Sequence, residues 1–184
     1  MVVKSKVVTE HLIDLGSAFE ILRKHKLRLR TITDLQLPRN PKEVQKLIGM
    51  IVALNRFISR SADICKPFFQ LLHKWMGFEW TEECNLAFKE LKEYLSQPPI
   101  LSRPKKEEVL CAYIVVTCHA VSLVLVRMES KVQKSVYYVS KSLQEAEIRY
   151  LPLEKAILAI VHATRKLPYY FQAYTVVVFT QLPL

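Results

Sequence analysis

Glycine, long apolar runs and paired cysteines are all scarce in this 184-residue chain, and each scarcity excludes a class of protein. Three glycines are present, Gly16, Gly49 and Gly77, where average usage of roughly 7% would give about thirteen. No two are close together, so neither a P-loop nor a dinucleotide-binding fingerprint can form. No apolar run approaches the roughly 18 residues of a membrane-spanning helix, and Met1–Lys6 is too short for the apolar stretch of a signal peptide. We therefore expect no membrane insertion and no secretion.

The four cysteines, Cys65, Cys84, Cys111 and Cys118, form no C-x-x-C pair and have no histidine at zinc-finger spacing. This spacing argues against a structural zinc site. Most of them fall at apolar-face positions, where a buried thiol is ordinary. The pattern predicts a reduced, intracellular chain without a metal site, and it leaves the choice between cytoplasm and nucleus open.

Charge is abundant and uneven, with a net charge of +10. Residues 1–74 hold 14 Lys and Arg against 6 Asp and Glu, whereas residues 75–184 hold 13 against 11. A basic half favours contact with polyanions such as nucleic acid, because phosphate contacts supply most non-specific affinity. Solubility alone is the other interpretation of the same charge.

The first half has helical periodicity. Residues 8–22 carry apolar side chains every three or four positions, and the basic run 23–30 follows them. That run either complements a helix dipole or grips phosphate. Asn40, Pro41 and Glu43 together form a strong helix start, and Thr81 is placed to cap another helix. A further helix is predicted over residues 62–73.

The second half changes to strand periodicity, which predicts strands over residues 109–116, 121–127, 135–140 and 174–180. Between the third and fourth strands, Pro152 opens a helix. The predicted buried side of that helix carries Leu153, Ile157, Ile160, Val161 and Leu167. The order β-β-β-α-β predicts a mixed sheet with a helix packed on it. The expected fold class is therefore α+β, with a helical first half followed by a mixed sheet.

Several strings, in this order, resemble the pol polyprotein of gypsy-type LTR retrotransposons of the kind found in plants. They are PRNPKEVQKLIG (38–49), LNRFISRS (54–61), FEWTEECNLAFKELK (78–92), PPIL (98–101), VYYVSKSL (136–143), AEIRY (146–150), Glu154-Lys155 and TQLPL (180–184). The resemblance implies a reverse transcriptase joined to a ribonuclease H-like domain. It divides the chain into a remnant of the polymerase palm (1–30), a helical thumb- or connection-like segment (31–74) and a ribonuclease H-like domain (75–184).

The chain departs from that pattern at three places. The family's Tyr-x-Asp-Asp polymerase signature would lie just before Met1, a hairpin of the palm is missing between Arg30 and Thr31, and the chain stops at Leu184 inside the ribonuclease H fold. We therefore expect a C-terminally truncated ribonuclease H-like sheet.

The family's chemistry uses two magnesium ions, which need carboxylate ligands. The only aspartates are Asp14, Asp34 and Asp63, all in the first half. The resemblance places Thr117, Ala156 and Gln181 where the family has its metal-binding carboxylates. We therefore expect a catalytically inactive chain that binds no metal or other cofactor, a pseudoenzyme in place of an RNA-directed DNA polymerase and ribonuclease H.

What remains is contact with a partner. The resemblance makes Arg39, Lys42, Lys46, Arg56 and Arg60 candidates for binding the nucleic-acid backbone, and the expected partner is an RNA–DNA hybrid or another nucleic acid, bound weakly and without sequence preference. Possible further contacts on the second half are Lys141, Arg149, Arg165 and Lys166. Each of these cations has a plain solvent-facing interpretation as well.

Three other interpretations stay open. An open sheet edge at residues 175–179 could pair with another chain and make a homo-oligomer. The chain could be an active nuclease for RNA–DNA hybrids, against the count of carboxylates. It could also be a pseudogene product without a selected role.

Overall fold

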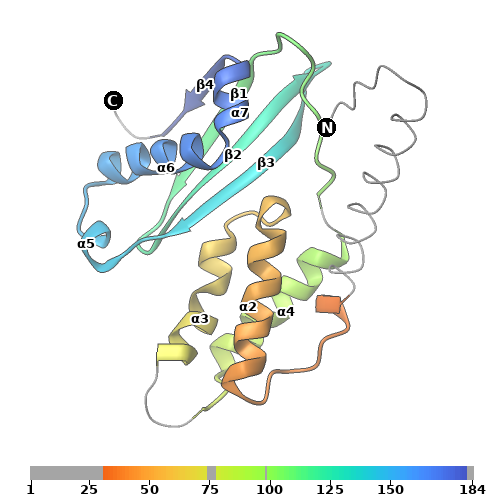
Figure 1. Ribbon diagram of the computed structural model, residues 1–184, viewed down its shortest axis with the longest axis vertical. Coiled ribbons are helices and arrows are strands. Elements are labelled where there is room, and N and C mark those ends of the chain that lie inside the picture. Colours follow the sequence, from red (N-terminus) through yellow and green to blue (C-terminus); the bar gives the residue numbers. More distant parts are fainter. Residues whose placement is uncertain (1–30, 74–77, 98, 182–184) are drawn as a thin grey trace.

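A computed structural model describes residues 31–73, 78–97 and 99–181, and these fold into a helical bundle beside a mixed four-stranded sheet (Figure 1). The mixed α+β architecture is the one that the sequence predicts. The helix expected over residues 8–22 and the basic run after it lie outside the described residues. Across the described ranges, no helix has both the length and the apolar character needed to cross a membrane.

The bundle consists of α2 (Pro41–Leu54), α3 (Ser61–His73) and α4 (Glu82–Ser96), with a short 3₁₀ helix (Asn55–Phe57) after α2. The predicted start of α2 is confirmed: the Glu43 N–H donates to Asn40 Oδ1 at 3.0 Å, and Asn40 Nδ2 donates to Glu43 Oε1 at 2.9 Å. The Thr81 side chain accepts from the Cys84 N–H at the start of α4, as predicted. Local capping chemistry therefore sets both helix starts.

One apolar core joins the three helices of the bundle. Its fully buried members include Val44, Leu47, Ile51, Leu54, Phe68 and Leu91. Trp80 stacks on Phe68 at 5.9 Å between ring centroids and meets Phe88 edge-on at 6.0 Å. The predicted domain boundary falls before α4, yet α4 buries its apolar face in the same core as α2 and α3.

The sheet has the strand order β3-β2-β1-β4. Strands β1 (Leu110–Val116), β2 (Ala120–Glu129) and β3 (Val132–Ser142) form an antiparallel meander. Helices α5 (Glu145–Ile148), α6 (Pro152–Lys166) and α7 (Pro168–Ala173) then lead to β4 (Val176–Phe179), which pairs with β1 in parallel. The predicted order is confirmed, with α5 and α7 as short additions that the periodicity did not indicate.

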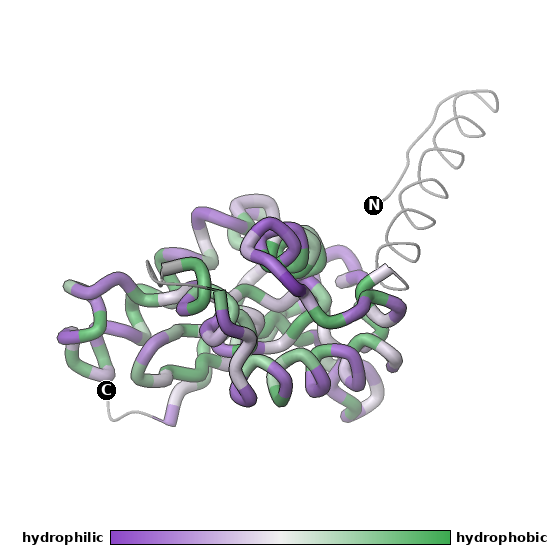
Figure 2. Tube along the Cα trace, turned by 90° about the horizontal axis from the view of Figure 1, so that it is seen from below, coloured by the Kyte–Doolittle hydropathy of each residue, from purple (hydrophilic) through white to green (hydrophobic). Residues whose placement is uncertain are grey.

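The predicted buried face of α6 is wrong. The residues that α6 buries are Lys155, Ala156, Ala159 and Ala163. Leu153, Ile157 and Val161 are exposed by 39%, 52% and 36%, and Ile160 is half-buried, although Leu167 beyond the helix end is buried as predicted. Alanines let the helix axis approach the sheet closely. Hydrophobic and hydrophilic residues are interleaved along the chain (Figure 2), so an apolar stripe alone does not identify the face that packs.

The bundle and the sheet meet along the 3₁₀ helix, α3 and β3. The Ala62 N–H donates to Ser140 Oγ at 3.1 Å. The guanidinium of Arg56 lies over the ring of Tyr137 at 5.4 Å from its centroid. Both contacts join residues far apart in sequence, so they fix the two parts against each other.

Candidate nucleic-acid interface

The three positions predicted for the family's carboxylates lie toward one end of the sheet. Because β1 and β4 are parallel, their carboxyl ends meet at the same edge; Thr117 directly follows β1 and Gln181 follows β4. The β1–β2 turn, α5 and the start of α6, which carries Ala156, lie at this end as well (Figure 1). A hydrogen bond of 2.8 Å from the Leu143 N–H to the His119 carbonyl ties the end of β3 to the same turn.

The side chains at these positions do not fit a magnesium pair. Thr117 Oγ1 accepts from the Ala120 N–H at 3.0 Å and lies 2.9 Å from Asp63 Oδ1. Ala156 presents a buried methyl group, and Gln181 an exposed amide. Magnesium prefers carboxylate oxygens, and here the set offers a hydroxyl, a methyl and an amide, with the single carboxylate of Asp63 beside them.

Two acidic side chains near this end, Glu147 and Glu154, already have partners. Glu147 binds Lys141 through Oε2 and accepts from the Gln144 N–H at 2.8 Å. The hydrogen bond from Lys141, helped by the one from Gln144, lowers the pKa of Glu147. Glu154 Oε2 accepts from the Leu151 N–H at 2.8 Å and so caps α6. Within the described part of the chain, no three His, Cys, Asp or Glu side chains are grouped so as to hold a metal ion.

The five predicted phosphate contacts fall into two groups. Arg39 is exposed just before α2, and Lys42 and Lys46 are exposed in its first two turns, where they share a face at a spacing of four residues. Arg56 and Arg60 lie beyond its other end. From Lys46 to the end of α2 at Leu54 the helix rises by about 12 Å at 1.5 Å per residue, so the two groups are separate. Contact of these five cations with nucleic acid stays a prediction.

Arg56 has a structural role that the sequence did not indicate. Its guanidinium lies 4.9 Å from the ring centroid of Phe57 and 5.4 Å from that of Tyr137. Its Nε is buried and has no hydrogen-bond partner among the described residues. Contacts of a cation with aromatic faces are favourable, so Arg56 helps to hold the bundle against β3.

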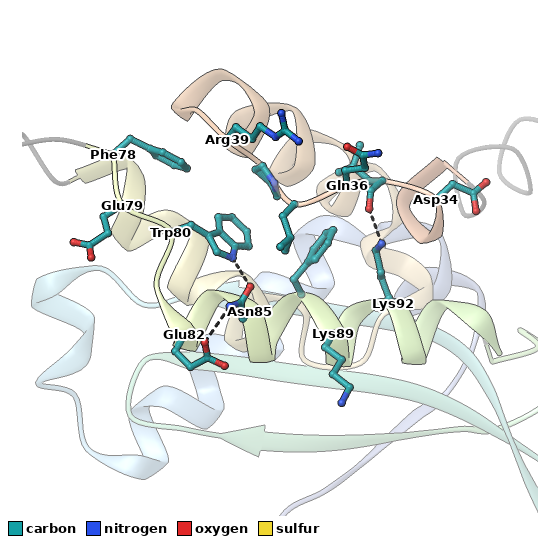
Figure 3. Close-up of a pocket in the computed structure, with 14 residues that line it drawn as sticks. Asp34, Gln36, Arg39, Phe78, Glu79, Trp80, Glu82, Asn85, Lys89 and Lys92 are labelled. Carbon is teal, nitrogen blue, oxygen red and sulfur yellow. Dashed lines mark hydrogen bonds between the residues drawn. The ribbon is translucent and has the colours of Figure 1, made fainter.

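A groove of about 1180 Å³ lies between residues 34–39 and the start of α4 (Figure 3). Trp80 Nε1 donates to Asn85 Oδ1 at 2.7 Å, and Asn85 Nδ2 donates to Glu82 Oε2 at 3.0 Å. Lys92 Nζ donates to the Leu35 carbonyl at 2.5 Å and lies over the ring of Phe88. The hydrogen bond of Lys92 joins residues 34–39 to α4 across the groove. Sequence reasoning missed it, because the pairs span up to 57 residues.

The additional predicted cations on the second half differ in exposure. Arg149, Arg165 and Lys166 are exposed, whereas Lys141 is half-buried and bound to Glu147. Of these four, Lys141 and Lys166 line one cleft between the bundle and the sheet.

Comparison with known proteins places more than half of the chain in one family. Residues 80–178 match the family model described as "RNase H-like domain found in reverse transcriptase". That range begins just before α4 and ends within β4, so it takes in all of the sheet except the last residue of β4, together with one helix of the bundle.

Curated relatives are polyproteins of transposons. The chain is 29% identical over 150 residues, 81% of its length, to the retrovirus-related Pol polyprotein from transposon 297 of Drosophila melanogaster. It is 25% identical over 137 residues, 74% of its length, to the transposon Tf2-3 polyprotein of Schizosaccharomyces pombe. The chain spans 14% and 10% of these two polyproteins.

Similar solved structures come from a foamy viral protease-reverse transcriptase. The form in complex with double-stranded DNA matches 85% of this chain and 28% of its own, with a TM-score of 0.70 and 21% identity. The form in complex with an RNA/DNA hybrid matches 98% of this chain and 29% of its own, with a TM-score of 0.71 and 19% identity. At such identities the likeness shows the fold.

Proposed function

Because the chain belongs to the family of RNase H-like domains found in reverse transcriptases, we propose that it binds double-stranded nucleic acid along the phosphate backbone without cleaving it. The observation that carries this proposal is the set of side chains near the carboxyl ends of β1 and β4. There, Thr117, Ala156 and Gln181 occupy the positions where the family resemblance expects carboxylates. The fold is retained but the metal-binding carboxylates are replaced, which favours a binding role over a catalytic one.

Backbone binding is supported by charge. The chain carries a net charge of +10, and Arg39, Lys42, Lys46 and Arg60 expose their side chains. The foamy viral proteins with a similar fold are in complex with double-stranded DNA and an RNA/DNA hybrid. Cations that neutralise phosphates release counterions, so such binding is sequence-independent and weakens steeply with salt.

The lack of cleavage is supported by the partners of the nearest acids. Glu147 binds Lys141, Glu154 caps α6, and Oδ1 of Asp63 accepts from Thr117. A pair of divalent ions needs several carboxylate oxygens at once. If these three side chains bound metal, the ion pair of Glu147, the helix cap of Glu154 and the contact of Asp63 between bundle and sheet would all be lost.

One experiment tests both halves of the proposal. The affinity of the chain for a fluorescein-labelled RNA–DNA hybrid is measured by anisotropy at several salt concentrations, and the same hybrid is incubated with the chain and magnesium. We expect affinity that falls linearly with salt on logarithmic axes, and intact hybrid. Salt-independent affinity contradicts backbone binding, and chelator-sensitive cleavage that co-elutes with the chain contradicts inactivity.

The finer origin and location of the chain are also proposals. We infer a gypsy-type element of plant origin from the order of the quoted strings, which run from residue 38 to residue 184. Long terminal repeats flanking the coding sequence in a plant genome would support this origin. We infer an intracellular location because all four cysteines are unpaired and Cys118 is exposed, as is usual for reducing compartments.

A second candidate function is self-association through β4. This strand lies at the edge of the sheet, next to β1 alone among the described strands. Val177, Val178 and Phe179 are exposed by 42%, 37% and 46%, and an edge strand with apolar side chains invites pairing with another chain. Light scattering over a range of concentrations tests this: Val177→Lys should dissociate a dimer, whereas Val161→Lys on the outer face of α6 should not.

A further inference from the structure

A cleft of about 210 Å³ opens where the bundle meets the sheet. Its polar lining comes from four elements: Asn55 from the 3₁₀ helix, Ser61 from α3, Ser140, Lys141 and Ser142 from β3, and His162 and Lys166 from α6. The residues from the bundle are distant in sequence from those of β3 and α6, so the cleft exists only when bundle and sheet are docked. The apolar side chains of α2 and α3 form the rest of its wall.

The charge lining this cleft is positive on balance. Lys141 is bound to Glu147, but Lys166 has no acidic partner among the described residues. Burial lowers the pKa of His162, and the charges of Lys166 and Lys141 lower it further, while Glu147 opposes them. Two lysines that both act on one half-buried imidazole create a local potential that a bound anion would relieve.

Hydrogen-bonding groups in the cleft are left free as well. Within the described ranges, neither the ring nitrogens of His162, the ammonium of Lys166 nor the hydroxyl of Ser142 makes a hydrogen bond. Ser140 is already engaged with the Ala62 N–H and the Ser122 hydroxyl. The free groups lie on β3 and α6 and face one space, where each can donate to an oxyanion.

We propose that this cleft binds a phosphate group of the nucleic-acid backbone, with Lys166 as its principal cation and His162 and Ser142 as further donors. The inference rests on the proposed function and gives it a specific site. An ammonium acts on phosphate as a point charge, and hydroxyl and imidazole donors add direction. A phosphate held here contacts β3 and α6 at the junction with α3, so its binding also favours the docked arrangement.

The test compares two cations of the second half. Lys166→Ala removes a cation that lines the cleft, and Lys106→Ala removes a cation that is 94% exposed and does not line it. Both variants lose one positive charge, so effects on net charge are matched. Affinity for a labelled RNA–DNA hybrid is measured for both at several salt concentrations, and circular dichroism checks their fold.

We expect Lys166→Ala to weaken hybrid binding about tenfold and to lower the salt slope by about one, and Lys106→Ala to stay within about twofold of the parent. His162→Gln and Ser142→Ala should give smaller losses. A parent chain that binds no hybrid would overturn the proposed function. Hybrid binding by the parent with equal effects of the two variants would overturn only the assignment of the cleft.

A second measurement uses inorganic phosphate as the probe. The pKa of the His162 ring is followed by NMR in phosphate and in chloride at equal ionic strength. The groups that act on this ring are Lys141 from β3, Lys166 from α6 and Glu147 from α5, while Cys65 of α3 stays a neutral thiol because burial raises its pKa to about 12. Phosphate in the cleft should raise the His162 pKa in the parent and not in Lys166→Ala. An unchanged pKa in the parent would contradict an anion site, and a shift without any effect of Lys166→Ala on hybrid affinity would contradict the nucleic-acid ligand.

Discussion

The hydroxyl of Thr117 lies 2.9 Å from Oδ1 of Asp63, and this contact joins the β1–β2 turn to helix α3. The two residues are 54 positions apart in the sequence. Oδ2 of Asp63 is buried and has no hydrogen-bond partner among the described residues. Thr117 therefore uses its side chain to fasten the sheet to the bundle, at the position where the family resemblance expects a metal-binding carboxylate.

Thr117→Val should destabilise the chain, because it removes the hydroxyl and leaves a carboxylate of α3 without that partner. A buried acceptor that loses its partner costs about 1–3 kcal/mol. The measurement is the free energy of unfolding from urea titrations monitored by circular dichroism. Thr117→Ser keeps the hydroxyl and serves as the control. Equal stability of the valine and serine variants would show that the contact contributes nothing.

The capping box of α2 gives a second prediction. Asn40→Ala removes the acceptor of the Glu43 N–H and the donor to the Glu43 carboxylate, and the loss of such a cap typically costs about 1 kcal/mol. Gln45→Ala, at an exposed position of the same helix, should change the stability by less than about 0.5 kcal/mol. The measurement is the midpoint temperature of thermal unfolding of both variants and the parent. An Asn40→Ala midpoint equal to that of the parent would contradict the prediction.

The fold could be read from the sequence wherever local chemistry decides it. Asn40, Thr81 and Pro152 mark helix starts that the structure confirms, because capping depends on residues only a few positions apart. The antiparallel meander could be predicted for the same reason, because the alternation of apolar and polar residues and the short turns between strands are local features of the sequence. The short helix α7, by contrast, begins at Pro168 only two residues after α6 ends, and periodicity did not separate the two.

The candidate site was less predictable, because its contacts cross between distant segments. Asp63 is the carboxylate that contacts Thr117, yet it belongs to the half of the sequence whose described residues, 31–73, form no strand of the sheet. Arg56 was predicted to face phosphate, and its place between Phe57 and Tyr137 depends on how β3 docks. The phosphate role of Arg56 stays a prediction.

The corrected face of α6 makes a third prediction. Ala163 is fully buried against the sheet, whereas Ile157 is 52% exposed. Ala163→Leu should therefore overpack the interface and cost about 1–3 kcal/mol, while Ile157→Ala should stay within about 0.5 kcal/mol of the parent. Urea titrations of both variants test the assignment. The opposite order of stabilities would mean that the apolar stripe predicted from the sequence is the packed one.

The cluster around Glu129 predicts how stability depends on pH. Hydrogen bonding from Lys134, with the charges of Arg127 and Lys134, lowers the pKa of Glu129 to about 2, whereas an unfolded glutamate titrates near about 4.3. Since the folded pKa is the lower one, the stabilisation is fully present above the unfolded pKa and is lost as pH falls from about 4.3 toward about 2.

Glu129→Gln should therefore be less stable than the parent near neutral pH, and the difference should shrink through that acidic window. Urea midpoints across the window measure it. Glu107→Gln is the control, because the Glu107 side chain is 86% exposed and pairs only with Lys106 at 3.8 Å, so its substitution should leave the pH dependence as in the parent. A difference between Glu129→Gln and the parent that stays constant down to about pH 2 would mean that the pairing with Lys134 and Arg127 does not stabilise the fold, because a charge interaction must vanish once the carboxylate is protonated.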